Sequence, residues 1–286
     1  MKSPEFLTSR GVDLEKSLEL FGDIETYNET VGDFVVGAVS KINKLREYMN
    51  AKDLANYAIY AHSLKSDGKY FGFTKLVDTA YEHELKSKDG DLYYICENFE
   101  NLATIATEAV NIVKEYLSDA PTSGPQQVTP AAVQQAVTTP QVEIIQQSLQ
   151  KSSAEIYSSN TILVVDDSNI IRNFTKKIFE GQYEVGTAKN GQEAIDIIEA
   201  NKGNGNIVAI LLDLNMPKVD GFEVLKYIEN SDLFEEMPVS IITGDSSKET
   251  IDKAYKYPIV DMLGKPFTEN DVKRIVEKTI SYKDLV

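Results

Sequence analysis

Side chains suited to metal or phosphoryl chemistry stand at the ends of short apolar runs in the C-terminal half of this 286-residue chain. The runs cover residues 162–165, 183–187, 207–212, 239–242 and 259–263. Asp166 and Asp167 follow the first run, Asp213 the third, Thr243 the fourth and Lys265 the fifth. Segments with helical period separate the runs, which predicts an α/β fold with a five-stranded, doubly wound parallel sheet.

The carboxyl ends of parallel strands meet at one edge of a sheet, where ligands bind in open α/β folds. Three carboxylates, a hydroxyl and a lysine at that edge favour Mg²⁺ or Mn²⁺, because unpaired carboxylates would otherwise repel or take up protons. An acidic residue after a strand is often only a helix N-cap, Asp167 included, but capping does not explain all five residues. A carboxylate beside a metal can attack phosphorus and form an aspartyl phosphate.

Residues 161–286 resemble a response-regulator receiver domain of two-component signalling. The resemblance rests on the segments Ile162–Ser168, Leu212–Gly221, Ile242–Asp245 and Gly264–Phe267. It implies a flavodoxin-like receiver fold in which Asp213 is the phosphoacceptor and Thr243 and Lys265 bind the phosphoryl oxygens. No glycine-rich loop follows the first run, which argues against nucleotide binding by the same fold.

The same resemblance implies a metal site made of four residues. Asp213 belongs to this set, and Asp167 is expected to bind the metal directly, Asp166 through water, and Asn215 through its backbone carbonyl. Met262 departs from the family, because many receivers have a Tyr or Phe three residues before the lysine that rotates inward on activation. The usual aromatic readout is therefore not expected here, although a flexible thioether can also repack.

In the N-terminal half, the histidine with the most informative surroundings is His62. On a helix, Tyr57, Tyr60 and Leu64 share one apolar face, and His62 falls on the opposite side with Lys65. This spacing predicts an exposed histidine beside positive charge that would stabilise a phosphohistidine. A solvated surface histidine without function is the simpler alternative.

The segment Ala61–Lys65, with Gly72 ten residues after the histidine, resembles a histidine phosphotransfer (HPt) domain. The resemblance covers roughly residues 10–118 and implies that His62 is phosphorylated and that Lys65 is its supporting cation. The sequence departs from the family at Ser66, where Gly is usual, and at Lys69-Tyr70, where small residues are usual. His83 stands between acidic residues and is predicted to be a surface residue.

The chain divides into two regions and a linker. The pattern of residues 1–120 predicts four or five helices that pack as a four-helix bundle, and residues 160–286 form the predicted receiver. Residues 121–159 are rich in Pro and Gln and form the predicted linker, with a short helix possible through Val142, Ile145 and Leu149. Each folded region is acidic, so bulk charge does not attract one to the other.

Composition excludes several classes of protein. The net charge is −16 at pH 7, which opposes general binding to nucleic acid. One cysteine, Cys96, and two histidines exclude an internal disulfide and multi-histidine metal sites. No apolar run approaches the roughly 20 residues of a membrane helix, and the first residues lack the apolar stretch of a secretory signal. We expect a cytoplasmic protein that does not insert into membranes.

The leading hypothesis is a phosphorelay protein that is not itself an enzyme beyond slow self-dephosphorylation at Asp213. Its expected partners are a sensor histidine kinase and other receiver or phosphotransfer proteins, and exchange with such partners is favoured over exchange between His62 and Asp213. One alternative is an interaction scaffold that works without phosphorylation. Another is a phosphohydrolase, but Asn215 stands where such enzymes place a general acid. The sequence leaves the oligomeric state and the pathway open.

Overall fold

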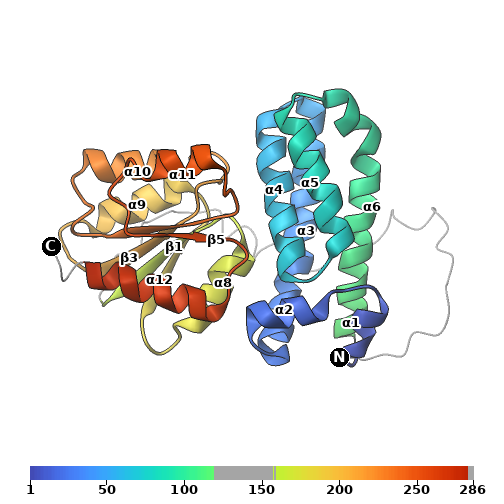
Figure 1. The fold of residues 1–286 in the computed structure, drawn as a ribbon, viewed down its shortest axis with the longest axis horizontal. Helices are drawn as coiled ribbons and strands as arrows, with labels where there is room; N and C mark the ends of the chain where they lie inside the picture. The colour runs from blue at the N-terminus through green and yellow to red at the C-terminus, as the bar shows by residue number, and fades with distance from the viewer. Residues whose placement is uncertain (119–156, 158, 283–286) are drawn as a thin grey trace, which may run out of the picture.

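The computed structural model describes residues 1–118, 157 and 159–282, which form a helical lobe and a sheet lobe (Figure 1). We call residues 1–118 the helical lobe and residues 159–282 the sheet lobe. The helix predicted through Val142, Ile145 and Leu149 lies outside the described residues. The two fold classes predicted for the two halves are confirmed.

Four long helices of the helical lobe pack as a bundle, and two short helices cover one end of it (Figure 1). The short helices are α1 (Glu5–Ser9) and α2 (Leu14–Phe21). The bundle consists of α3 (Ile24–Ala51), α4 (Leu54–Tyr70), α5 (Thr74–Lys88) and α6 (Leu92–Leu117). Aspartates fix where several helices start, because the side chains of Asp23, Asp53 and Asp91 each accept a backbone N–H from the third residue on.

Gly72 lies in the turn that follows α4. Its φ angle is 73°, and a Cβ atom there would lie 2.3 Å from the carbonyl oxygen of Asp13. Only glycine fits, because the backbone turns left-handed and approaches the start of α2 closely. The glycine noted in the HPt resemblance therefore ties the end of α4 to α2.

The sheet lobe contains five parallel strands in the order β2-β1-β3-β4-β5. They are β1 (Thr161–Val165), β2 (Glu184–Ala188), β3 (Ile207–Leu212), β4 (Val239–Thr243) and β5 (Met262–Gly264). The last strand is shorter than the predicted run 259–263, because Ile259 and Val260 bond to Tyr257 and to the start of β4 instead. β1 and β3 are neighbours, which places their carboxyl ends side by side.

Helices cover both faces of the sheet (Figure 1). One face carries α8 (Asn169–Ile178) and α12 (Glu269–Tyr282). The other carries α9 (Gly191–Asn201), α10 (Gly221–Asn230) and α11 (Lys248–Ala254). The fully buried strands β1 and β3 contribute alternate side chains to the two cores.

The two lobes share a continuous apolar core. The Phe21 and Phe174 rings meet edge to face at a centroid distance of 5.3 Å, and Tyr70 meets Phe267 in the same way at 5.9 Å. All four side chains are almost fully buried. Such aromatic pairs contribute about 1 kcal/mol each beyond the area that they bury. Local apolar contact therefore joins two lobes that bulk charge does not attract.

Among the described residues, no helix combines the length and the apolar character that crossing a membrane requires.

Candidate functional site

Three carboxylates gather at the carboxyl ends of β1 and β3. Asp166 and Asp167 follow β1 and Asp213 follows β3, and one oxygen of each lies within 4.8 Å of the others. Asp166 and Asp213 are buried, whereas Asp167 is partly exposed. The sheet order makes this cluster, because β1 and β3 are adjacent and point the same way. The sequence prediction that these residues converge is confirmed.

Lys265 supplies the only side-chain cation paired with this cluster in the described structure. Its Nζ lies 2.6 Å from Asp166 Oδ2 and 2.6 Å from Asp213 Oδ2. Burial lowers the pKa of Lys265, but the two facing carboxylates outweigh burial, so the pKa is raised and the lysine stays charged. The backbone N–H of Lys265 bonds to the carbonyl of Thr243, which fixes the loop after β5 to the end of β4.

One lysine does not neutralise three carboxylates. The pKa of Asp213 is raised to about 7, because burial and the neighbouring carboxylates of Asp166 and Asp167 outweigh the opposing charge of Lys265. Burial also raises the pKa of Asp166. A hard divalent cation fits this donor set, because oxygen ligands at this separation suit Mg²⁺ and their negative charge exceeds that of the lysine.

Thr243 and Asn215 lie on the same rim. Thr243, the last residue of β4, is buried, and its Oγ1 accepts a hydrogen bond from the backbone N–H of Asp245. The backbone N–H of Asn215 donates to Asp213 Oδ1 at 3.1 Å. This bond orients the Asp213 carboxylate. The metal-binding role expected for the Asn215 carbonyl stays a prediction.

His62 is not exposed, which corrects the sequence prediction. It is 9% exposed, because the sheet lobe covers the face of α4 that was expected to meet solvent. A Cβ atom added to Gly244, the residue after Thr243, would lie 2.5 Å from His62 Nε2. The helical period correctly placed His62 away from the bundle core, but it could not show that another lobe packs there.

Glu84 on α5 holds the other ring nitrogen of His62. Its Oε1 lies 3.0 Å from His62 Nδ1, and its Oε2 accepts from Lys65 Nζ at 2.5 Å. Lys88 Nζ also donates to Glu84 Oε1, at 2.6 Å. Burial raises the pKa of Glu84, but the bonds from His62, Lys65 and Lys88 outweigh it, so the pKa is lowered and the carboxylate stays charged.

This carboxylate was missed by the sequence reasoning. Ala80, Glu84 and Ser87 follow steps of three and four on α5, and all three are buried. That period was available in the sequence, but the charge of Glu84 suggested a solvated face. Lys65 is also buried, with its Nζ 3.4 Å from His62 Nδ1, so it lies beside the histidine as predicted but binds Glu84.

His83 is buried, so the prediction of a surface residue is wrong. The side chain has no exposed area, and its Nδ1 lies 2.8 Å from the Tyr57 hydroxyl. Its ring packs between those of Tyr57 and Tyr94. Burial lowers the pKa of His83 to about 4, so the ring is neutral at pH 7. His83 is a core residue of the bundle.

Two hydroxyl–carboxylate bonds join the lobes beside the acidic cluster. Ser63 Oγ on α4 donates to Asp167 Oδ2 at 2.8 Å, and Ser168 Oγ donates back to Asp67 Oδ1 at 3.0 Å. We call this set of four residues the reciprocal clamp. Asp67 lies one turn after Ser63, is 1% exposed and also pairs with Lys41. The clamp places α4 against the start of α8.

A pocket of about 410 Å³ joins the two groups of residues. His62, Glu84 and Lys88 line it from the helical lobe, and Asn215 lines it from the sheet lobe. The structure therefore brings His62 and the rim that carries Asp213 to one site, which is a juxtaposition that the sequence left open.

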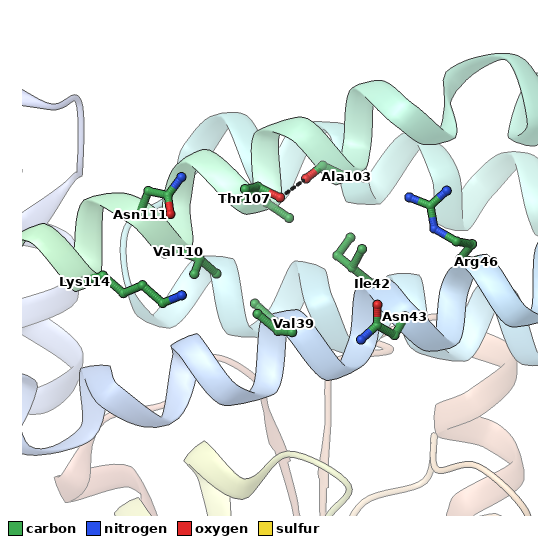
Figure 2. Close-up of a pocket in the computed structure, with 11 residues that line it drawn as sticks. Val39, Ile42, Asn43, Arg46, Ala103, Thr107, Val110, Asn111 and Lys114 are labelled. Carbon is green, nitrogen blue, oxygen red and sulfur yellow. Dashed lines mark hydrogen bonds between the residues drawn. The ribbon is translucent and has the colours of Figure 1, made fainter. Parts of the chain in front are cut away.

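A second pocket, of about 300 Å³, lies between α3 and α6 (Figure 2). Val39, Ile42 and Val110 form its apolar part, and Arg46 and Lys114 stand toward its ends (Figure 2). Its lining includes no histidine or carboxylate. It shares no residue with the site described above.

Comparisons with known proteins concern the sheet lobe. Residues 162–277 match the family described as response regulator receiver domain. The chain is 35% identical over 128 residues to a probable methanogenesis regulatory protein, FilR2, of Methanothrix harundinacea, covering 42% of this chain and 81% of that protein. It is 30% identical over 121 residues to a chemotaxis protein CheY homolog of Campylobacter jejuni, covering 42% of this chain and 91% of that protein.

A third relative is much longer than this chain. It is the CAI-1 autoinducer sensor kinase/phosphatase CqsS of Vibrio cholerae, 38% identical over 120 residues that cover 41% of this chain and 16% of that protein. The match to the receiver family leaves the helical lobe unassigned. Together with the acidic cluster, the lysine and the strand order, these similarities show that the chain belongs, through residues 162–277, to the response regulator receiver domain family.

Proposed function

We propose that this protein is a two-component phosphorelay protein in which Asp213 and His62 each accept and pass on a phosphoryl group. The receiver family is typically a phosphorylated signalling module rather than an enzyme. The observation that carries the proposal is the buried cluster of Asp166, Asp167 and Asp213 with Lys265 at 2.6 Å from two of them.

Asp213 is the proposed nucleophile of the sheet lobe. The N–H of Asn215 orients one carboxylate oxygen, while Lys265 and Thr243 stand where they would bind the oxygens of the transferred group. Asp166, Asp167, Asp213 and the carbonyl of Asn215 would hold Mg²⁺ or Mn²⁺. That ion would neutralise charge on the phosphoryl oxygens when bound. No general acid or base follows Asp213 at position 215, which supports slow rather than rapid hydrolysis.

His62 is the proposed nucleophile of the helical lobe. Glu84 at Nδ1 favours the tautomer that keeps the proton on Nδ1 and the lone pair on Nε2, the nitrogen that faces Gly244. Lys65 and Lys88 stabilise the charge of Glu84. The HPt resemblance supports this role.

The proposed partners are other proteins of two-component signalling. The similarity to a sensor kinase/phosphatase supports a histidine kinase as the source of phosphoryl groups. The scaffold alternative has no need for a charged pocket that costs free energy to bury, so the pocket argues against it.

One experiment tests the proposal. The full chain is incubated with Mg²⁺ and either labelled acetyl phosphate or a phosphorylated partner, and wild type, Asp213→Asn and His62→Gln are compared on a phosphate-affinity gel. We expect acetyl phosphate to give an alkali-labile label that disappears in Asp213→Asn, and transfer from the partner to give an acid-labile label that disappears in His62→Gln. Label of both kinds persisting in both variants would contradict the assignments. Wild type that binds Mg²⁺ but stays unlabelled would favour the scaffold.

A further inference from the structure

We propose that the phosphoryl partner of Asp213 is His62 of the same chain, and that Gly244 is the residue that admits His62 to the site. The inference rests on the proposed function and adds to it the partner of each residue. Three features of the lobe interface support this pairing.

The first feature is the position of His62 relative to the acidic cluster. Ser63, the next residue, donates a hydrogen bond to Asp167, and His62 itself lines a pocket with Asn215. Both sheet-lobe residues belong to the rim that carries Asp213. The imidazole therefore stands at the edge of this pocket, and it is buried where Gly244 of the sheet lobe approaches it.

The second feature is the space that Gly244 leaves. A methyl group there would have His62 Nε2 at 2.5 Å, His62 Cε1 at 2.9 Å and Ser66 Oγ at 3.5 Å as its three nearest atoms. All three belong to the helical lobe. A Cβ atom at position 244 would therefore crowd the docked histidine. The sheet lobe itself would have room for that Cβ atom.

His62 could not easily move aside to relieve that crowding. Its Nδ1 is held by Glu84, which is itself held by Lys65 and Lys88. Alanine at position 244 would have to break this arrangement or push the lobes apart.

The third feature is the register of docking. In the reciprocal clamp, each lobe gives one hydroxyl and one carboxylate, so a shift of one lobe would leave Asp67 buried without Ser168. Gly37 of α3 adds a close approach, since a Cβ atom there would lie 3.3 Å from Asn169 Oδ1. The docked arrangement is thus specified by side chains of both lobes.

The transfer step balances without a co-reactant. The P–O bond to Asp213 breaks and a P–N bond to His62 Nε2 forms, while the electron pair of the broken bond returns to the carboxylate. The reverse reaction breaks the P–N bond and re-forms the P–O bond to Asp213, which restores the acyl phosphate, a mixed anhydride. Tethering and docking give the two groups a high effective concentration, on the order of millimolar or above.

The test follows labelled phosphoryl in the full chain. Asp213 is labelled from acetyl phosphate in the presence of Mg²⁺, excess donor is removed, and acid-labile label on His62 is measured over time. We expect a first-order rate for wild type that stays the same when the protein is diluted about tenfold. A rate that falls in proportion to concentration would overturn the inference.

Gly244→Ala and Gly32→Ala form a matched pair of added methyl groups. Gly32 on α3 has no atom within 4 Å of its added Cβ, so this variant should transfer as wild type does. Gly244→Ala should accept label on Asp213 as wild type does. It should transfer that label to His62 at about one tenth of the wild-type rate or below. Transfer at the wild-type rate by Gly244→Ala would remove Gly244 from the proposal.

Failure of this inference is distinguishable from failure of the proposed function. Label that forms on Asp213 but never reaches His62 in wild type would overturn exchange within the chain and leave Asp213 as a phosphoacceptor. Absence of label on Asp213 would overturn the proposed function and this inference with it. If Gly244→Ala does not fold, the dilution experiment on wild type still decides.

Discussion

The pocket around Asp213 and the site around His62 are built in different ways. The pocket draws Asp166, Asp213 and Lys265 from three strand ends of one sheet, so its geometry follows from the topology. The histidine site draws His62 from α4 and Glu84 from α5, and the other lobe completes it through Gly244. One site is preformed by its own fold, whereas the other is finished by docking.

The largest expected effect concerns the preformed pocket. Lys265→Met should slow labelling of Asp213 by acetyl phosphate about 10²- to 10³-fold, because it removes the buried cation that faces the reacting oxygens. Lys273→Met removes a more exposed lysine that pairs with Glu269 on α12 and serves as the control. Labelling of Lys265→Met at the wild-type rate would show that the pocket does not use this lysine.

The second prediction concerns His83 in the bundle core and the pH dependence of stability. The pKa of His83 is lowered from 6.5 to about 4 in the folded protein. Between these values the unfolded chain takes up a proton that the folded chain does not, so stability falls as the pH falls. Wild type should lose up to about 3 kcal/mol of unfolding free energy relative to His83→Gln between pH 6.5 and 4.

Denaturant unfolding of both proteins at several pH values measures this difference. A constant difference between wild type and His83→Gln from pH 7 to pH 4 would contradict a buried neutral His83.

The acidic cluster and the two histidines show which features could be predicted from the sequence. The runs that became β1, β3 and β4 are short, apolar and buried, so the residues after them were correctly placed at one edge of a sheet. His62 and His83 were both predicted to be exposed, and both are buried. Helical period assigns a residue to a face of its own helix, but it does not show what packs on that face.

Glu84 gives the third prediction, which asks whether the histidine site depends on its carboxylate. Glu84→Ala should slow phosphoryl transfer to His62 about 10- to 100-fold, because it removes a charged hydrogen-bond partner. Glu84→Gln should lose less, since its amide oxygen can still accept from Nδ1. Nitrogen NMR of the His62 ring should show a changed tautomer balance in Glu84→Ala.

Glu82→Gln is the control, because Glu82 is exposed on the same helix and bonds to Tyr94 instead. An unchanged tautomer in Glu84→Ala together with slower transfer would point to a general structural defect and count against a positioning role. Unchanged transfer would remove Glu84 from the site.

The smallest expected effects concern the reciprocal clamp. Ser63→Ala and Ser168→Ala should each weaken docking of the lobes by about 1 kcal/mol, because each removes one hydroxyl–carboxylate bond. Ser159→Ala removes a similar bond, to Glu184, at an exposed position away from the interface. Distances between spin labels at the exposed Cys96 and at Lys226→Cys report docking. If Ser63→Ala and Ser168→Ala show the same undocked population as Ser159→Ala, the clamp does not determine how strongly the lobes dock.

Mixing two inactive chains tests most directly whether the preformed pocket and the docked histidine form one site. His62→Gln carries a working Asp213 only, and Asp213→Asn carries a working His62 only. With label placed on Asp213 of the first chain at micromolar concentration, we predict transfer to His62 of the second about a hundredfold more slowly than within wild type. Transfer between the mixed chains as fast as within wild type would contradict exchange inside one chain.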